Sequence, residues 1–201
     1  MTHASVESPL STRDVILDSA QDFIQSFGYV GFSYRDVAAA IGIRAPTIHY
    51  YFPTKADLGR AVAERYGARF RAVRDEACAA ASPTKALEIY AQLFRESLAN
   101  RDRVCLFGML MAGGKGAPDG VQEAAIAFFD ENIDWLAARF DEARAARDAD
   151  LGSVPPRHAA KMFFAGLEGA MVVANASRRL ADFDDAAGAL LGMWKRAPLS
   201  S

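Results

Sequence analysis

Three observations on the sequence predict an all-α protein. Long segments rich in Ala, Leu, Glu, Arg and Met, which favour helices, alternate with short clusters of Gly and Pro. Apolar residues in these segments recur at spacings of three and four, as they do along one face of a helix. No segment shows a sustained alternation of apolar and polar residues rich in β-branched side chains, so strands are not expected.

The first expected helix covers residues 12–27. Ser11 or Thr12 can cap its start, and Gly28 can end it. One apolar stripe of helical period follows the segment and should face the core. The stripe consists of Ile16, Ala20, Phe23, Ile24 and Phe27.

Two very short helices should follow. The second begins at Ser33 and ends at Gly42, and at about two turns it is too short to be stable unless neighbours hold it. The third covers about 45–52, with Pro46 in its first turn, where the missing N–H costs nothing. Pro53 ends it.

The rest of the chain is expected to form six further helices. Thr54 can cap the first of them. They are expected at about 55–80, 83–99, 103–112, 119–149, 156–180 and 183–196, with loops at 113–120 and 148–156. We therefore divide the chain into a disordered tail (1–10), an N-terminal domain (11–66) and a larger helical domain (67–201).

Length and composition narrow the class of protein. The chain has 201 residues, of which 51% are hydrophobic, and a formal net charge of −2. This apolar content argues against disorder over most of the chain. The longest uncharged apolar run, 104–114, is well short of the roughly 20 residues that cross a bilayer. The first ten residues lack the pattern of a signal peptide, so we expect a cytoplasmic protein without membrane association.

The reactive side chains do not predict a catalytic or metal site. Cys78 and Cys105 are too few for a disulfide framework, and the three histidines are too scattered to bind a metal. His158 and Glu168 lie in apolar surroundings, but ten residues along one helix keep them apart. We therefore expect no enzyme activity and no cofactor.

The two short helices and the glycine between them form a helix-turn-helix layout. Ala38 is small, so the third helix can cross close over the second, and Gly42 takes a turn conformation at little steric cost. Ile43 and Ile48 fill the corner. The outer face of the third helix is then free to enter a DNA major groove. Because the sequence pI is near 5.9, DNA binding must come from this local surface.

Four short runs in this region carry a family resemblance. They are Ile16-Leu17-Asp18-Ser19-Ala20; Phe27-Gly28-Tyr29 with Gly31-Phe32-Ser33; Asp36-Val37-Ala38 with Gly42-Ile43; and Thr47-Ile48-His49-Tyr50-Tyr51-Phe52-Pro53-Thr54-Lys55 with Leu58. Residues 12–66 thereby resemble the DNA-binding domain of the tetracycline-repressor (TetR) family of transcriptional regulators. Arg44 stands where the family often has a capping Ser, and His49 stands where it usually has Tyr.

The resemblance implies a homodimeric regulator that binds double-stranded DNA at a palindromic operator. It most often implies a repressor that a small-molecule effector releases from DNA. Contacts to phosphates position such a protein, and contacts to base edges specify the sequence. The resemblance implies phosphate contacts by His49, Tyr51 and Lys55, and base contacts by Arg44, Ala45, Pro46, Thr47 and Tyr50.

Other interpretations stay open on the sequence alone. Tyr50, Tyr51 and Phe52 also fit an ordinary core stripe, and Phe52 is expected in the core. The chain would then be an all-α enzyme or a protein-interaction module. Charge gives DNA binding only modest support, because five basic and six acidic side chains lie between residues 1 and 60. A strong salt dependence of DNA binding is expected only of the regulator.

The larger helical domain is apolar enough to enclose a cavity. By resemblance, its last two long helices pair with their copies in a dimer. The small residues at 166–176 suit such a contact, but also fit packing within one chain. Large aromatic or flexible side chains are pocket candidates, although each also fits a plain core. They are Phe94, Phe107, Met109, Met111, Phe128, Phe129, Trp135, Met162 and Phe163.

Cys105 suggests an alternative way of sensing. It is expected in the first turn of the 103–112 helix, beside Arg101 and Arg103. A helix N-terminus and nearby cations lower a thiol pKa, and the family resembled includes regulators that sense electrophiles or oxidants through cysteine. The opposing interpretation is a buried, inert thiol, which we also expect for Cys78.

Overall fold

The computed structural model describes residues 11–101, 104–112 and 116–195, without the side chains of Asn100, Arg101 and Ala112. Within these ranges every regular element is a helix, which confirms the predicted fold class. The elements are α1 (Thr12–Phe27), α2 (Tyr34–Ala40), α3 (Ala45–Tyr51), α4 (Lys55–Cys78), α5 (Pro83–Arg101), α6 (Leu106–Ala112), α7 (Asp119–Ala145), α8 (Pro156–Ser177) and α9 (Leu180–Gly192). A membrane-spanning helix is not found in the described ranges. The tail expected at 1–10 lies outside them.

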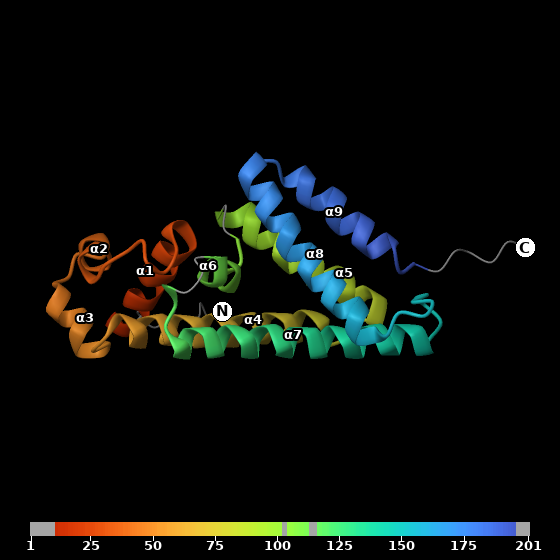
Figure 1. The fold of residues 1–201 in the computed structure, drawn as a ribbon, viewed down its shortest axis with the longest axis horizontal. Coiled ribbons are helices and arrows are strands. Elements are labelled where there is room, and N and C mark those ends of the chain that lie inside the picture. The colour runs from red at the N-terminus through yellow and green to blue at the C-terminus, as the bar shows by residue number, and fades with distance from the viewer. Residues whose placement is uncertain (1–10, 102–103, 113–115, 196–201) are drawn as a thin grey trace, which may run out of the picture.

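Helices α1 to α3 form a head at one end of the molecule (Figure 1). The Ser11 hydroxyl caps α1 by accepting a bond from the Asp14 amide, and Gly28 ends the helix at φ 74°. The predicted apolar stripe is confirmed for Ile16 and Ile24, which are fully buried, but not for Phe27, which is 63% exposed. Helix α1 packs against both α4 and α6, so its buried face is broader than a single stripe.

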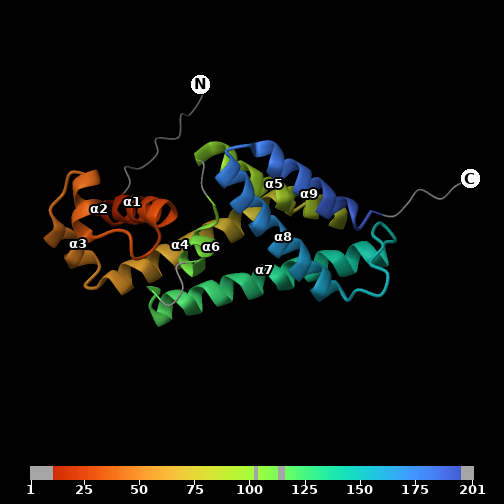
Figure 2. The same cartoon turned by 45° about the horizontal axis from the view of Figure 1, so that its top comes forward.

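Helix α4 leaves the head and runs without interruption into the rest of the molecule, which we call the body (α5 to α9 with the outer part of α4). Thr54 and Asp57 form a capping box at its start. Helix α7 lies alongside α4 (Figures 1 and 2), and in Figure 1 this long pair lies beneath the other body helices. A shift of α4 in the body therefore carries directly to the head.

Helices α8 and α9 cover the body on the other side. Gly166 lets them approach closely, because a Cβ at this position would come within 2.6 Å of Leu190. Phe140 of α7 packs edge-on against Phe163 and Trp194, which anchors the segment directly after α9 in the core. The small-residue stretch 166–176 therefore serves packing within one chain on part of its surface.

Several predicted helix ends in the body are wrong. Helix α7 ends at Ala145 instead of 149, since Arg147 adopts a left-handed conformation at φ 62°. Helix α8 ends at Ser177, followed by Arg178 at φ 55°, and α9 covers Leu180–Gly192 instead of 183–196. Helix α6 begins at Leu106, and the expected start at 103 lies outside the described residues.

Candidate nucleic-acid interface and internal cavity

The turn between α2 and α3 has the geometry that the sequence predicted. Ser33 and Asp36 form a full capping box at the start of α2. Gly42 lies at φ 70°, in the left-handed region that favours glycine. Arg44 precedes α3 without a side-chain cap, and Pro46 in the first turn helps to start the helix instead.

The inner side of α3 is fixed to the head by apolar contacts and one hydrogen bond. Ile48 is fully buried and Phe52 is 3% exposed, so Phe52 is a core residue as expected. The Tyr34 hydroxyl donates a 2.8 Å bond to the Phe52 carbonyl, which joins α2 to the end of α3. This attachment holds a two-turn helix that would not be stable alone.

The outer side of α3 carries the residues expected to contact DNA. Tyr50 is 82% exposed and its ring packs edge-on against Tyr51, which is 37% exposed. The core interpretation of these two tyrosines is therefore wrong. Arg44, Pro46 and His49 are also exposed, and Ala45 and Thr47 are partly exposed. The fold thus brings seven of the expected DNA-contact residues onto one helix and its start.

Two of the expected phosphate contacts have partners inside the head. His49 Nδ1 lies 3.3 Å from the Pro53 carbonyl oxygen, and its ring packs against Tyr34. The Lys55 ammonium donates a 2.5 Å bond to the Phe32 carbonyl and lies over the rings of Phe32 and Tyr29. Burial lowers the pKa of Lys55. A phosphate contact by Lys55 stays a prediction, and it requires the ammonium to leave this carbonyl.

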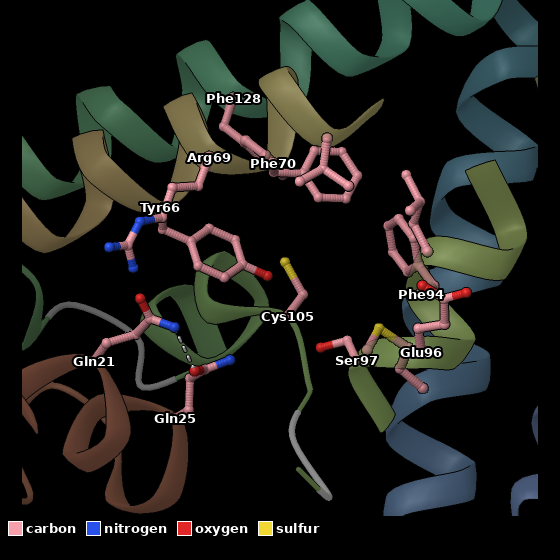
Figure 3. A pocket seen from close by; sticks show the side chains of 13 residues that line it. Gln21, Gln25, Tyr66, Arg69, Phe70, Phe94, Glu96, Ser97, Cys105 and Phe128 are labelled. Carbon is pink, nitrogen blue, oxygen red and sulfur yellow. Dashed lines mark hydrogen bonds between the residues drawn. The ribbon is translucent and has the colours of Figure 1, made fainter. Parts of the chain in front are cut away.

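A cavity of about 310 Å³ lies where the head meets the body (Figure 3). Its walls come from α1, α4, α5, α7, α8 and the segment before α6. Aromatic and aliphatic side chains form most of the wall, and amide, hydroxyl and thiol groups gather toward α1 and α6. The lining residues are Gln21, Gln25, Tyr66, Arg69, Phe70, Val73, Leu93, Phe94, Glu96, Ser97, Cys105, Phe128 and Met171.

Only part of the predicted pocket set lines this cavity. Phe94 and Phe128 do, and Phe70 of α4 packs edge-on against both. The structure places the other candidates elsewhere. Phe107 stacks on Phe128, Phe163 packs edge-on against Phe140 in the core, and Phe129 contacts Phe107 and Phe164. Trp135 stacks on Tyr90, and Met109 lines a separate hollow beside Phe27 and Val30. Met111 packs against the core, and Met162 is 47% exposed.

Cys105 lies on the cavity wall, but not in the predicted environment. It precedes α6 instead of lying in its first turn, and its amino-acid neighbours Arg101 and Arg103 contribute no described side chain. Burial and the nearby Glu168 carboxylate raise the pKa of the Cys105 thiol well above its ordinary value. The alternative of a low-pKa thiolate is therefore wrong, and the thiol is buried, as the opposing interpretation expects. Cys78 is also buried, and burial raises its pKa.

Glu168 of α8 is a buried carboxyl beside this wall. It is hydrogen-bonded to the Cys105 thiol, and its Oε1 atom has no hydrogen-bond partner among the described residues. Burial raises its pKa to about 7. The charged form is thus disfavoured at this position, and the carboxyl changes its protonation near neutral pH.

An apolar stripe remains exposed on the outer face of α8. Met162, Val172 and Val173 are 47%, 59% and 57% exposed, and Ala165, Gly169 and Ala176 are exposed beside them. A Cβ at Gly169 would meet nothing within 4 Å. Gly188 and Gly192 of α9 and Met193 just after it are exposed, whereas Trp194 is buried.

Within the described residues, no group of three His, Cys, Asp or Glu side chains is placed to hold a metal ion.

Comparison with known proteins identifies relatives of the head and of the whole chain. Residues 16–62 match the family model described as bacterial regulatory proteins, tetR family. The HTH-type transcriptional repressor ComR of Escherichia coli is 42% identical over 60 residues, which span 30% of this chain and 29% of that repressor. The transcriptional regulator AcuR of Cereibacter sphaeroides is 28% identical over 156 residues, or 76% of this chain and 71% of AcuR.

The fold is similar to solved structures over nearly its full length. A TetR-family transcriptional regulator from Agrobacterium tumefaciens superimposes with a TM-score of 0.89 at 28% identity, covering 94% of this chain and 100% of that one. A TetR regulator from Legionella pneumophila gives a TM-score of 0.84 at 25% identity. The likeness therefore extends from the head through the body.

Proposed function

We propose that this chain, which belongs to the TetR family of DNA-binding transcriptional regulators, is a dimeric repressor that a small molecule releases from a palindromic operator. The observation that carries the proposal is the helix α3, whose inner side is locked in the head while Tyr50 and its neighbours extend outward. The name of the relative ComR, a transcriptional repressor, favours repression.

Two copies of the head would read two half-sites. Heads related by a two-fold axis enter successive major grooves when their α3 helices lie about 34–36 Å apart. The exposed stripe of Met162, Val172 and Val173 on α8 supports a dimer, because a contiguous row of exposed apolar side chains commonly marks a contact with another protein chain. Gly169 supports it further, since its open Cβ position suits the close approach of a second helix.

The cavity supports the effector part of the proposal. Phe70, Phe94 and Phe128 offer an apolar surface for a compact ligand body, and the polar groups toward α1 can orient one hydrogen-bonding end. Because α4 forms part of the wall and also begins in the head, an occupant that tilts α4 moves the head. A ligand that favours the DNA-incompetent arrangement must bind more weakly when DNA is present, by the same factor.

The proposal is tested by site selection from random duplexes, followed by sedimentation of the protein alone. We expect an enriched near-palindromic site, a two-chain species at micromolar concentration, and a salt slope of several units. A monomer, or binding without salt dependence, contradicts the proposal and favours an all-α interaction module. A thermal-shift screen of small molecules, with hits titrated with and without the selected site, tests the effector; equal affinity in both conditions contradicts that hit as an inducer.

Replacing Tyr50 with alanine should relax sequence preference. Tyr50 is the most exposed of the α3 aromatics, so its removal leaves the head folded and deletes one contact to base edges. We expect about a 5- to 150-fold loss of affinity for the selected site, little change on random DNA, and an unchanged salt slope. Arg35→Ala on the exposed start of α2 is the matched surface control. An equal loss on all duplexes would instead assign Tyr50 to phosphate contact.

A further inference from the structure

The cavity wall contains a direct connection between the head and the body. Gln25 of α1 is 7% exposed, which is unusual for a glutamine. Its amide nitrogen donates a 2.9 Å bond to the Val104 carbonyl, across 79 residues of chain. Its amide oxygen accepts a 3.1 Å bond from Gln21, as the dashed line in Figure 3 shows. Both glutamines line the cavity.

The body end of this connection is also part of the cavity. Val104 immediately precedes Cys105, whose thiol points into the cavity, and α6 begins at Leu106. The Tyr66 hydroxyl of α4 points toward the same thiol (Figure 3). A molecule in the polar part of the cavity therefore touches groups on both sides of the Gln25 bond.

The second connection between head and body borders the cavity as well. Arg65 of α4 donates a 2.7 Å bond to Asp18 of α1, and Arg69 lies 3.1 Å from the same carboxylate. Arg69 lines the cavity and is 54% exposed, whereas Arg65 is only 13% exposed and does not line the cavity. The exposed Arg69 pair contributes little, and Arg65 is not in reach of an occupant of the cavity. The Gln25 bond is therefore the stronger candidate for transmitting a change.

We propose that Gln25 is a positioning residue that couples occupancy of the cavity to the head. The bond to Val104 is intact when the head is oriented to bind DNA. An occupant that displaces either glutamine amide or the 104–105 segment breaks this bond and releases α1 from the body. The effector then acts on α1 directly, in addition to tilting α4. This inference rests on the proposed function, because it assumes that the head binds DNA and the cavity takes a ligand.

The thiol of Cys105 allows a test without a known effector. Iodoacetamide is small and uncharged, so DNA does not change its concentration near the protein. We expect bound operator DNA to slow alkylation of Cys105 by about three- to tenfold, the range that a single hydrogen bond supplies. Peptide mass spectrometry measures the rate, with the buried Cys78 as internal control.

The variant Gln25→Met keeps the volume of the side chain and removes both of its hydrogen bonds. It should bind the operator but lose most of the effect of DNA on the Cys105 rate. Gln122→Met is the matched control, because Gln122 also donates to a backbone carbonyl, that of Ala117, but within one part of the body. Retained DNA protection in Gln25→Met, or no protection in the unaltered protein, overturns the proposal.

A second variant keeps the proposal testable if Gln25→Met fails to fold. Gln21→Ala changes a partly exposed position and removes only the bond that orients the Gln25 amide. It should reduce the protection of Cys105 by DNA, and undiminished protection overturns the proposal. Operator binding is measured first by anisotropy on the same samples. No binding at all refutes the proposed function, whereas binding without coupling refutes only the role of Gln25.

Discussion

Replacing Gly169 with glutamate is expected to convert the proposed dimer into a monomer and to weaken operator binding by at least about 100-fold, since each head must then hold its half-site alone. The position is exposed in the middle of α8, and a side chain there meets nothing within 4 Å of the same chain. Only a second copy would be displaced by it. Sedimentation and anisotropy on the selected operator measure the two effects.

The fold itself should tolerate this change. A glycine inside a helix costs about 0.5–1 kcal/mol relative to alanine, so a side chain at this exposed position favours the helix of the separate chain. Ala72→Glu, at an exposed alanine of α4, is the matched control and should remain dimeric. If Gly169→Glu sediments as two chains and binds normally, the α8 stripe is not the dimer contact.

Replacing Glu168 with glutamine should stabilise the protein above neutral pH by about 2–3 kcal/mol. The pKa of Glu168 in the folded protein is raised to about 7 by burial, against an ordinary value of 4.5. The folded state therefore binds the proton more tightly than the unfolded state does. The stability that follows is fully present below pH 4.5 and is lost as pH rises through about 7.

Glutamine at this position removes the titration but keeps the shape of the side chain. The stability difference between the variant and the unaltered protein should therefore grow from pH 5 to pH 8 and then level off. Urea unfolding at four pH values measures it. Comparing the two proteins cancels the carboxyls with lowered pKa, among them Asp36 and Asp57, whose contributions fall away at acidic pH.

The control is a carboxyl whose pKa is lowered in the folded protein instead of raised. The hydrogen bond from Arg71 lowers the pKa of Glu131. Its contribution is therefore present above its ordinary pKa and is lost as pH falls, so Glu131→Gln should destabilise the protein at neutral pH and lose its effect in acid. A Glu168→Gln difference that stays constant from pH 5 to pH 8 would show that this carboxyl does not titrate near neutrality.

The head could be predicted closely because its sequence carries local signals. Ser33 and Thr54 cap helices through side chains three residues away, Gly42 needs its left-handed conformation, and Pro46 marks a first turn. Each of these effects acts within a few residues. The exposure of Tyr50 and burial of Phe52 follow from the same short helix, because positions two apart face different sides.

The cavity could not be predicted in the same way. Its polar part comes from Gln21 and Gln25 of α1, Tyr66 of α4 and Cys105 before α6, which only tertiary packing brings together. The sequence contained one usable signal: two glutamines four residues apart beside an apolar stripe, on a helix that buries two faces. The helix ends at Arg147 and Arg178 were missed because arginine rarely takes a left-handed conformation.

The uninterrupted course of α4 has a consequence for exchanging heads between relatives. A flexible linker would let two domains be cut and rejoined anywhere, but here the junction is a helix that begins at Lys55 and ends at Cys78. Each residue added to a helix turns everything beyond it by about 100° and moves it by 1.5 Å. A chimera joined one residue out of phase would face α3 away from DNA with every contact inside the head intact. We expect an insertion at this junction to preserve the orientation of α3 only when its length is near a whole number of turns, and about seven residues is the first length that restores the orientation.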